Sequence, residues 1–177
     1  MLGEALAYSE DRNPYFATLR YYFIRTFCFV DMPLDMVLRT FLGTFRIPGE
    51  AQAIDRIMDD LSVYVYETNP GPFLSAGALF SVLFSCLLLN TDLHNPGVKT
   101  RMAFDDFCRN NHGINDDNDL PVEYLRYLYD SIKNEEIKLL SSSTDMLDLS
   151  HWEEDINYRA NKVSQAVFMG GGPCRRR

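Results

Sequence analysis

Apolar residues recur every three or four positions along most of the chain, which is the spacing of one face of an α-helix. This pattern predicts helices over residues 15–30, 35–45 and 51–67, and the last is the most clearly amphipathic. No stretch of useful length alternates in the way a β-strand does, so the pattern predicts an all-α fold. The apolar face of the first helix is expected to hold Phe16, Leu19, Phe23, Phe27 and Val30.

Residues 73–89 carry no charge and are apolar on most sides. Their length makes the segment a borderline candidate for a transmembrane helix. We favour a buried central helix because Ser75, Ser81 and Ser85 dilute the apolar run and no basic residues flank its ends. The alternative is a small membrane protein anchored by this segment.

Two further helices are expected over residues 102–110 and 121–133, with Asp119 as a candidate N-cap of the second. Residues 1–140 are therefore expected to form one helical domain. The rest of the chain is expected to divide into a linker, a possible extra helix and a disordered tail, at residues 141–151, 152–168 and 169–177.

Charge and composition narrow the class of partner. Acidic residues outnumber basic ones 25 to 17, which gives a net charge of -8. A protein that neutralises nucleic-acid phosphates needs the opposite sign, so no nucleic-acid partner is expected. Hydrophobic residues make up 46% of the 177 residues, which is enough for the core of one soluble domain.

The cysteines and histidines do not suggest a reactive site. Cys28, Cys86 and Cys108 lie in or beside apolar stretches and are expected to be buried thiols of a reduced, intracellular protein. Apolar surroundings raise the pKa of a thiol, so Cys86 is not expected to be a nucleophile. The histidines lack metal-ligand spacing and the acidic loop 116–119 lacks the EF-hand pattern, so neither a metal nor a cofactor is expected.

Glu50 is the first candidate functional residue. It follows Pro48 and Gly49 at the start of a predicted helix, where most acids only complement the helix dipole. The alternative is that the Pro-Gly break presents the carboxylate at the tip of a tight loop whose base is anchored by Phe45 and Ile47. A carboxylate held in this way could enter a pocket of a partner protein.

The second candidate feature is the run from Leu87 to Pro96, in which an apolar helix abruptly becomes rich in amides and carboxylates. Capping and turn chemistry would account for such a change. The functional interpretation is a hydrophobic groove with a polar lip, which would suit the docking of loops of another protein.

Two long motifs together resemble those of the Sec-seven domain family. Phe45-Arg46-Ile47-Pro48-Gly49-Glu50-Ala51-Gln52, followed by Ile54-Asp55-Arg56, resembles the family's first signature. Leu89-Asn90-Thr91-Asp92-Leu93-His94-Asn95-Pro96 resembles the second, and the likeness covers roughly residues 1–140. The resemblance implies a right-handed helical superhelix that acts as a guanine-nucleotide exchange factor for small GTPases of the ADP-ribosylation factor (Arf) family, without covalent chemistry.

The family's mechanism, transferred to this sequence, gives Glu50 the central role. Its carboxylate would enter the nucleotide site of the GTPase, repel the β-phosphate of GDP and compete for the magnesium ion and the phosphate-binding lysine. The same resemblance implies binding to both the GDP-bound and the nucleotide-free GTPase. The residues expected to bind the GTPase are Arg46, Ile47, Asp55, Met58, Leu87, Leu88, Asn90, Thr91 and Asn95.

The sequence also departs from the family pattern. Family domains begin about three helices earlier, so the chain is expected to start inside the domain and to lack its first helices. This motivates the main alternative, an exchange-inactive helical scaffold that still binds a small GTPase. Phe84, Ser85, Asp92 and Met102 correspond to the positions that set sensitivity to brefeldin, and all but Phe84 match the sensitive type.

This mixture most resembles the large Golgi exchange factors and predicts partial sensitivity to brefeldin. The resemblance to these exchange factors also implies a cytoplasmic protein that associates peripherally with Golgi membranes, through its partner or through regions outside this chain.

Overall fold

The computed structural model describes residues 2–7, 14–47 and 51–140, and every regular element within these ranges is an α-helix. The prediction of an all-α fold is confirmed. The predicted linker, extra helix and tail beyond residue 140 lie outside the described residues. The helices are α1 (Leu2–Ala7), α2 (Pro14–Ile24), α3 (Leu34–Leu42), α4 (Ala51–Thr68), α5 (Ala76–His94), α6 (Phe104–Asn110) and α7 (Val122–Asn134).

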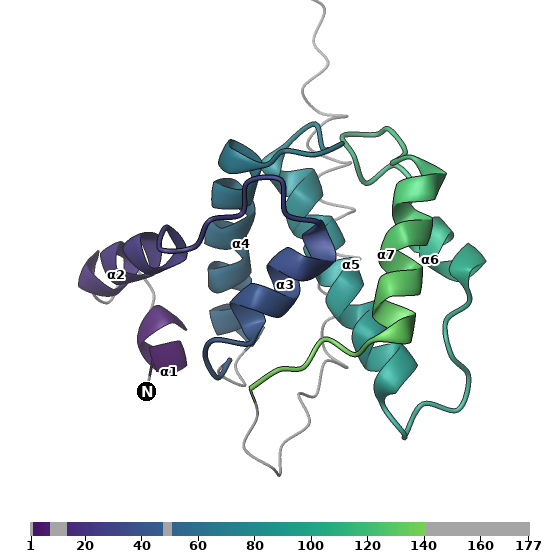
Figure 1. Cartoon of the computed structure of the whole chain (residues 1–177), viewed down its shortest axis with the longest axis horizontal. Helices are drawn as coiled ribbons and strands as arrows, with labels where there is room; N and C mark the ends of the chain where they lie inside the picture. The colour runs from purple at the N-terminus through teal and green to yellow at the C-terminus, as the bar shows by residue number, and fades with distance from the viewer. Residues whose placement is uncertain (1, 8–13, 48–50, 141–177) are drawn as a thin grey trace, which may run out of the picture. The chain divides into compact units, whose positions relative to one another are not determined.

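Helix α5 is the central element of the described domain, as Figure 1 shows. It packs against α4 on one side and α7 on the other, and it also contacts α3 and α6. By length and composition α5 could cross a membrane, but half of its apolar window is buried inside the protein. The prediction of a buried central helix is therefore confirmed. The buried residues are Ala78, Leu79, Val82, Leu83, Phe84, Cys86, Leu87, Leu89 and Asn90.

The ends of α5 differ from the predicted 73–89. The helix starts later because Ser75 is its N-cap, and the Ser75 hydroxyl accepts a hydrogen bond of 3.1 Å from the amide of Ala78. It continues to His94, so most of the second signature is helical. The helix ends there because Asn95 precedes Pro96, and a residue before proline avoids the helical conformation.

Helix α2 is shorter than predicted and ends at Ile24 rather than near residue 30. The chain then turns, and Asp31 adopts a positive φ of 57° before α3 begins. Val30, expected on the apolar face, is 58% exposed, so this part of the prediction is wrong. Phe27 is half-buried and makes ring contacts with other aromatic residues, namely Phe23, Phe29 and Phe41.

The short helix α1 was not predicted, because no long apolar pattern marks it. It packs on α2 and α4, and its Leu6 side chain is fully buried. Arg20 of α2 is only 3% exposed; it donates to the Leu6 carbonyl oxygen at 3.0 Å and pairs with Asp60 of α4. Since a buried guanidinium needs several acceptors, this arrangement ties all three helices together.

The connection between α6 and α7 corrects a second local prediction. Asp119 is not the N-cap of α7, because that position is taken by Pro121. The Asp119 carboxylate instead accepts a hydrogen bond of 2.8 Å from the amide of Gly113. In the same loop, Asn115 is buried and its side chain binds the amide of Leu74 at 2.8 Å and the carbonyl of Pro72 at 3.1 Å. The loop thereby fixes the turn that precedes α5.

Candidate functional site

The first signature begins in the segment that follows α3. Phe45 and Ile47 are 4% and 8% exposed, and the Phe45 ring lies 5.1 Å from Phe41 and 5.7 Å from Phe23, measured between centroids. The prediction that Phe45 and Ile47 anchor this segment is confirmed, while Arg46 between them is exposed. Glu50 lies outside the described residues, and its role stays a prediction.

Helix α4 carries two further predicted site residues in different environments. Asp55 is half-buried, whereas Met58 is completely buried among the core residues. Because α4 packs along α5, Met58 lies in the interior of the domain. Met58 can therefore support the position of α4, but its side chain has no surface to offer a partner in this structure.

Five of the eight predicted residues on α5 and at its C-cap form a continuous, half-exposed stripe. Residues three or four positions apart share one face of a helix. The members of the stripe follow one another at this spacing, and one adjacent pair widens it. This face contrasts with the opposite side of α5, which is buried. We call it the α5 stripe and define it as Ser85, Leu88, Thr91, Asp92 and Asn95.

Three other predicted residues of α5 are buried. Leu87 and Phe84 are 6% and 3% exposed, and the Phe84 ring lies 4.7 Å from that of Phe80. Asn90 is 6% exposed and lies on the opposite side of the helix from the α5 stripe. Both ends of its amide are occupied, since Oδ1 accepts from the amide of Ile137 at 2.7 Å and Nδ2 donates to the Ile137 carbonyl at 3.2 Å.

The structure brings together two of the predicted brefeldin-site residues. The Asp92 carboxylate accepts a hydrogen bond of 2.5 Å from the amide of Met102, ten residues further along the chain. Arg101 also reaches back to the Asp92 carbonyl at 3.3 Å, and the Tyr129 hydroxyl donates to the Met102 carbonyl at 2.8 Å. Asp92 and Met102 thus form one side of the α5 stripe together with the loop that returns from the end of α5.

Asn95 ends the α5 stripe in a tight turn. Its Oδ1 accepts a hydrogen bond of 2.8 Å from the amide of Gly97, and its carbonyl accepts one of 3.2 Å from the amide of Val98. A side chain at residue 97 would place its Cβ only 3.2 Å from Asn95 Oδ1. Gly97 therefore allows this close turn, in which the Asn95 side chain is held at a fixed position.

Sequence reasoning missed a polar network next to this site. Arg39 of α3 donates to three backbone carbonyl groups at and beyond the end of α7, and Asp35 lies one helical turn before it with its oxygen 3.9 Å from the Arg39 Nε. An acid and an arginine four residues apart on a helix are a recognisable sequence signal. Their carbonyl partners lie more than 90 residues away, however, and no local pattern identifies them.

The described cysteines differ in accessibility. Cys86 is fully buried; burial, and secondarily the negative charge of Asp35, raise its pKa to about 12. The predicted direction of this shift is confirmed. Cys28 is exposed, so its expected burial is wrong, and Cys108 is half-buried. Within residues 2–7, 14–47 and 51–140, no group of three or more metal-binding side chains comes together.

The difference in accessibility between Cys28 and Cys86 predicts that an alkylating reagent modifies Cys28 selectively. A pKa raised from 9.0 to about 12 leaves Cys86 with roughly a thousandth of the ordinary thiolate at neutral pH, and the folded chain also shields it. A short iodoacetamide pulse on the native protein should modify Cys28 and spare Cys86 until urea is added. Peptide mass spectrometry measures both sites, and equal native modification of Cys28 and Cys86 would contradict this placement.

Both the sequence and the fold of this chain are similar to those of known proteins. The family model described as the Sec7 domain matches residues 1–137. The chain is 44% identical over 139 residues to Brefeldin A-inhibited guanine nucleotide-exchange protein 2 of Arabidopsis thaliana, covering 78% of this chain and 8% of that protein. It is 40% identical over 171 residues to human Cytohesin-2, covering 97% of this chain and 40% of that protein.

A solved structure of ARF1-GDP bound to a Sec7 domain complexed with brefeldin A gives the same fold. It superposes with a TM-score of 0.65 at 38% sequence identity, and the match covers 72% of this chain and 65% of that one. The chain therefore spans less than half the length of the two curated relatives, while the family model matches most of this chain. On sequence and fold together, this chain belongs to the Sec7 domain family.

Proposed function

We propose that this chain promotes the release of GDP from a small GTPase of the Arf family. The observation that carries the proposal is the α5 stripe, a half-exposed face that holds Leu88, Thr91 and Asn95 of the predicted docking set together. Two comparisons support the choice of partner. The relatives named above include a guanine nucleotide-exchange protein, and the solved neighbour contains ARF1-GDP bound to a Sec7 domain.

In this proposal the α5 stripe receives the switch regions of the GTPase. Leu88 lies near its middle and would supply apolar contact, while Thr91 and Asn95 would form hydrogen bonds to the switch backbone. Burial of apolar surface contributes roughly 25 cal/mol per Å², so a few such side chains can supply most of the docking energy. Arg46 and Asp55 would add polar contacts from α4 and the segment before it.

The buried members of the predicted set have a different role in this proposal. Ile47, Met58, Leu87 and Asn90 are each less than a tenth exposed, so they would lie beneath the docking surface without contacting the GTPase. They fix the positions of α4 and α5, on which the exposed residues stand. Direct contact with the GTPase is proposed for the exposed and half-exposed residues alone.

Glu50 would displace the nucleotide once the partner is docked. Its carboxylate would approach the β-phosphate of GDP and the magnesium ion, both of which belong to the GTPase. Two like unit charges 4 Å apart repel by about 4 kcal/mol at the effective dielectric of a partly closed site. A repulsion of this size is enough to weaken GDP binding by roughly three orders of magnitude.

The same contacts would also hold the nucleotide-free GTPase. Binding to this state lowers the barrier to GDP release without setting the direction of exchange, because the coupling between nucleotide and exchange factor is reciprocal. Incoming GTP would then displace the exchange factor. No covalent bond is made or broken in this cycle, so the activity is catalysis of release.

Fluorescent-GDP release tests the proposal. The chain is titrated against an Arf-family GTPase loaded with fluorescent GDP, and a small GTPase of the Ras family serves as the control. The release rate should rise with chain concentration for the Arf protein alone. Binding to the Arf protein without faster release would favour the alternative, an exchange-inactive scaffold, and stimulation of both GTPases would contradict the choice of partner.

Partial inhibition by brefeldin A follows from the proposed drug-site residues. Asp92, Met102 and Ser85 match the sensitive type, whereas Phe84 stands where sensitive members have tyrosine. We expect incomplete inhibition of GDP release at high drug concentration and stronger inhibition of the Phe84→Tyr variant. Full activity of both proteins at high brefeldin A would overturn this assignment.

The place of action is proposed from the relatives' names. Brefeldin A-inhibited exchange proteins are among the relatives, so we propose a cytoplasmic protein that associates peripherally with Golgi membranes. The membrane contact would come from the GTPase or from regions outside this chain.

A further inference from the structure

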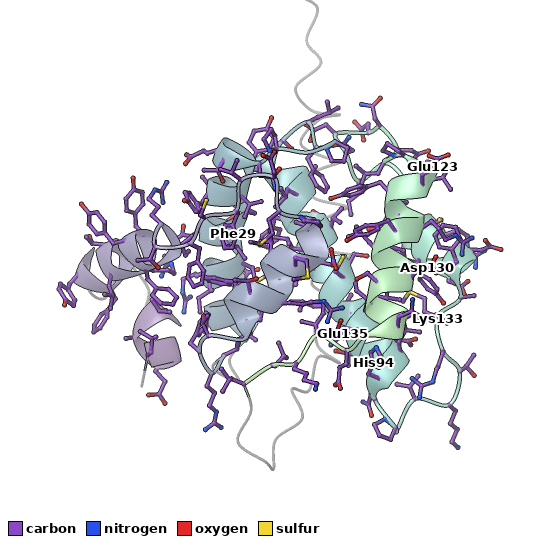
Figure 2. The ribbon with its side chains drawn as sticks, in the orientation of Figure 1. Phe29, His94, Glu123, Asp130, Lys133 and Glu135 are labelled. Atoms are coloured by element: carbon purple, nitrogen blue, oxygen red, sulfur yellow. The ribbon has the colours of Figure 1, made fainter. Side chains whose placement is uncertain are left out.

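We propose that Arg39 and Asn90 are positioning residues for nucleotide exchange, because together they hold the segment after α7 between α3 and α5 and so fix the two signature regions relative to each other. This inference rests on the proposed function. It concerns residues that contact neither GDP nor, in our proposal, the GTPase. Figure 2 shows the region, where Glu135 and His94 mark the ends of α7 and α5.

Arg39 holds the end of α7. Its guanidinium donates to the carbonyl oxygens of Ser131, Glu135 and Glu136 at 3.3, 2.7 and 2.8 Å. A helix leaves its last carbonyl groups without partners, and its C-terminal end carries partial negative charge. A planar cation with several donors satisfies both requirements, which a lysine could do only in part.

Asp35 holds Arg39 in this orientation. Asp35 is 3% exposed and accepts hydrogen bonds from the hydroxyl groups of Tyr127 at 2.8 Å and Ser131 at 2.6 Å. Both partners belong to α7, so the carboxylate attaches α3 to the same helix whose end Arg39 binds. Arg39 is therefore fixed from both sides, by its own helix and by α7.

The segment then passes to α5, where Asn90 binds it. The Asn90 amide makes two hydrogen bonds to the backbone of Ile137, and the Ile137 side chain is 1% exposed. His94 links α5 to α7 itself, since its Nε2 lies 2.7 Å from the carbonyl oxygen of Ile132. Residues 135–137 are therefore attached to α3 at one end and to α5 at the other.

This arrangement connects the two signatures. Helix α3 ends at Leu42, three residues before Phe45 of the first signature. Helix α5 carries the second signature, and Asn90 lies on the face opposite the α5 stripe. The clamp, defined here as Arg39, Asn90 and residues 135–137, thus joins α3, which leads into the first signature, to the buried side of α5, which carries the second, and it leaves the α5 stripe accessible.

We expect the clamp to affect the displacement of GDP and not the docking of the GTPase. In the proposed complex the α5 stripe makes the main docking contact and Arg46 and Asp55 only add to it, whereas displacement of GDP needs the first-signature loop at a fixed distance from the docked GTPase. Loosening the clamp should therefore lower kcat for GDP release and leave KM for the GTPase nearly unchanged. A misplacement of about 1 Å can cost up to 100-fold in rate, so a roughly tenfold loss of kcat is a moderate expectation.

The test compares clamp variants with matched controls in the whole chain. The variants are Arg39→Ala, Asn90→Ala and the milder Arg39→Lys. The controls are Arg25→Ala and Asn69→Ala, since Arg25 pairs with Glu67 42 residues away and the Asn69 amide binds the carbonyl groups of Phe29 and Met32. All five are assayed for fluorescent-GDP release at a temperature at which circular dichroism shows each to be folded.

The expected result is a roughly tenfold lower kcat for Arg39→Ala and Asn90→Ala, with KM within twofold of wild type and the controls near wild type. Arg39→Lys should be intermediate, and it tests the clamp if the alanine variants do not fold. Equal losses in clamp and control variants, or a change in KM alone, would overturn the positioning role. An inactive wild-type chain would instead contradict the proposed function, so the two failures are distinguishable.

Discussion

Replacing Glu50 with lysine is expected to reduce stimulated GDP release to the spontaneous rate, a loss of about 100- to 1000-fold, which is typical when a single charge-determining group of a transition state is removed. The carboxylate is proposed to repel the β-phosphate, and lysine would attract it. The substitution therefore reverses the sign of the proposed interaction as well as removing it. Fluorescent-GDP release from an Arf protein measures the effect.

Glu123→Lys is the matched control for this prediction. Glu123 is exposed in the first turn of α7, at the end of that helix away from Glu135 in Figure 2, and it undergoes the same change of two charge units. It should release GDP at nearly the wild-type rate. If Glu50→Lys and Glu123→Lys were equally active, net charge and not the position of Glu50 would govern exchange.

Replacing Leu88 with aspartate is expected to lower kcat/KM for GDP release by roughly 100-fold. Leu88 is half-exposed near the middle of the α5 stripe, where the proposed GTPase contact is apolar. Central apolar contacts dominate interface energies, and an unpaired carboxylate there loses its hydration on docking, which costs about 2–4 kcal/mol. The loss should appear mainly in KM, in contrast to the loss expected for Glu50→Lys.

Leu74→Asp provides the control for Leu88→Asp. Leu74 is 55% exposed and lies just before Ser75, the N-cap of α5, so it is about 20 Å from Leu88 at 1.5 Å per helical residue. The chemical change is identical, but the proposed interface is absent there. A similar loss of kcat/KM in both variants would mean that Leu88 is not part of a docking surface.

The regular helices could be predicted well from the sequence. The apolar faces of α4 and α7 repeat without interruption, and the observed helices start and end within a residue or so of the predicted 51–67 and 121–133. Their amphipathic pattern is set locally, by residues three and four positions apart. Family membership was predictable for a similar reason, because two contiguous motifs carry it.

The end of α5 could not be predicted in the same way. Asn90 follows an apolar run and looks like the start of a polar turn, yet it is buried within the helix. A buried amide is costly unless its hydrogen bonds are satisfied, and its partner is Ile137, 47 residues later. The prediction for Val30 was wrong because this apolar residue, although at helical spacing, lies in a turn and is exposed.

The residues of the candidate site were predicted as a set. Which of them are exposed and which are buried was not predicted. The sequence motif alone does not distinguish the exposure of Leu88 from that of Asn90. In the structure Leu88 is half-exposed and Asn90 is buried. Arg39 was overlooked because its acceptors are backbone carbonyl groups, which have no sequence signal of their own. The role of such a residue can be recognised only in a structure, which shows the distant segments in contact.

The most direct test of the central claim measures docking and release in one stopped-flow experiment. An Arf protein loaded with fluorescent GDP is mixed with increasing wild-type or Glu50→Lys chain, and complex formation is followed in parallel by light scattering. We predict that both chains form the complex with the GDP-bound GTPase and that only the wild type accelerates GDP release. Release by Glu50→Lys at the wild-type rate would contradict the account.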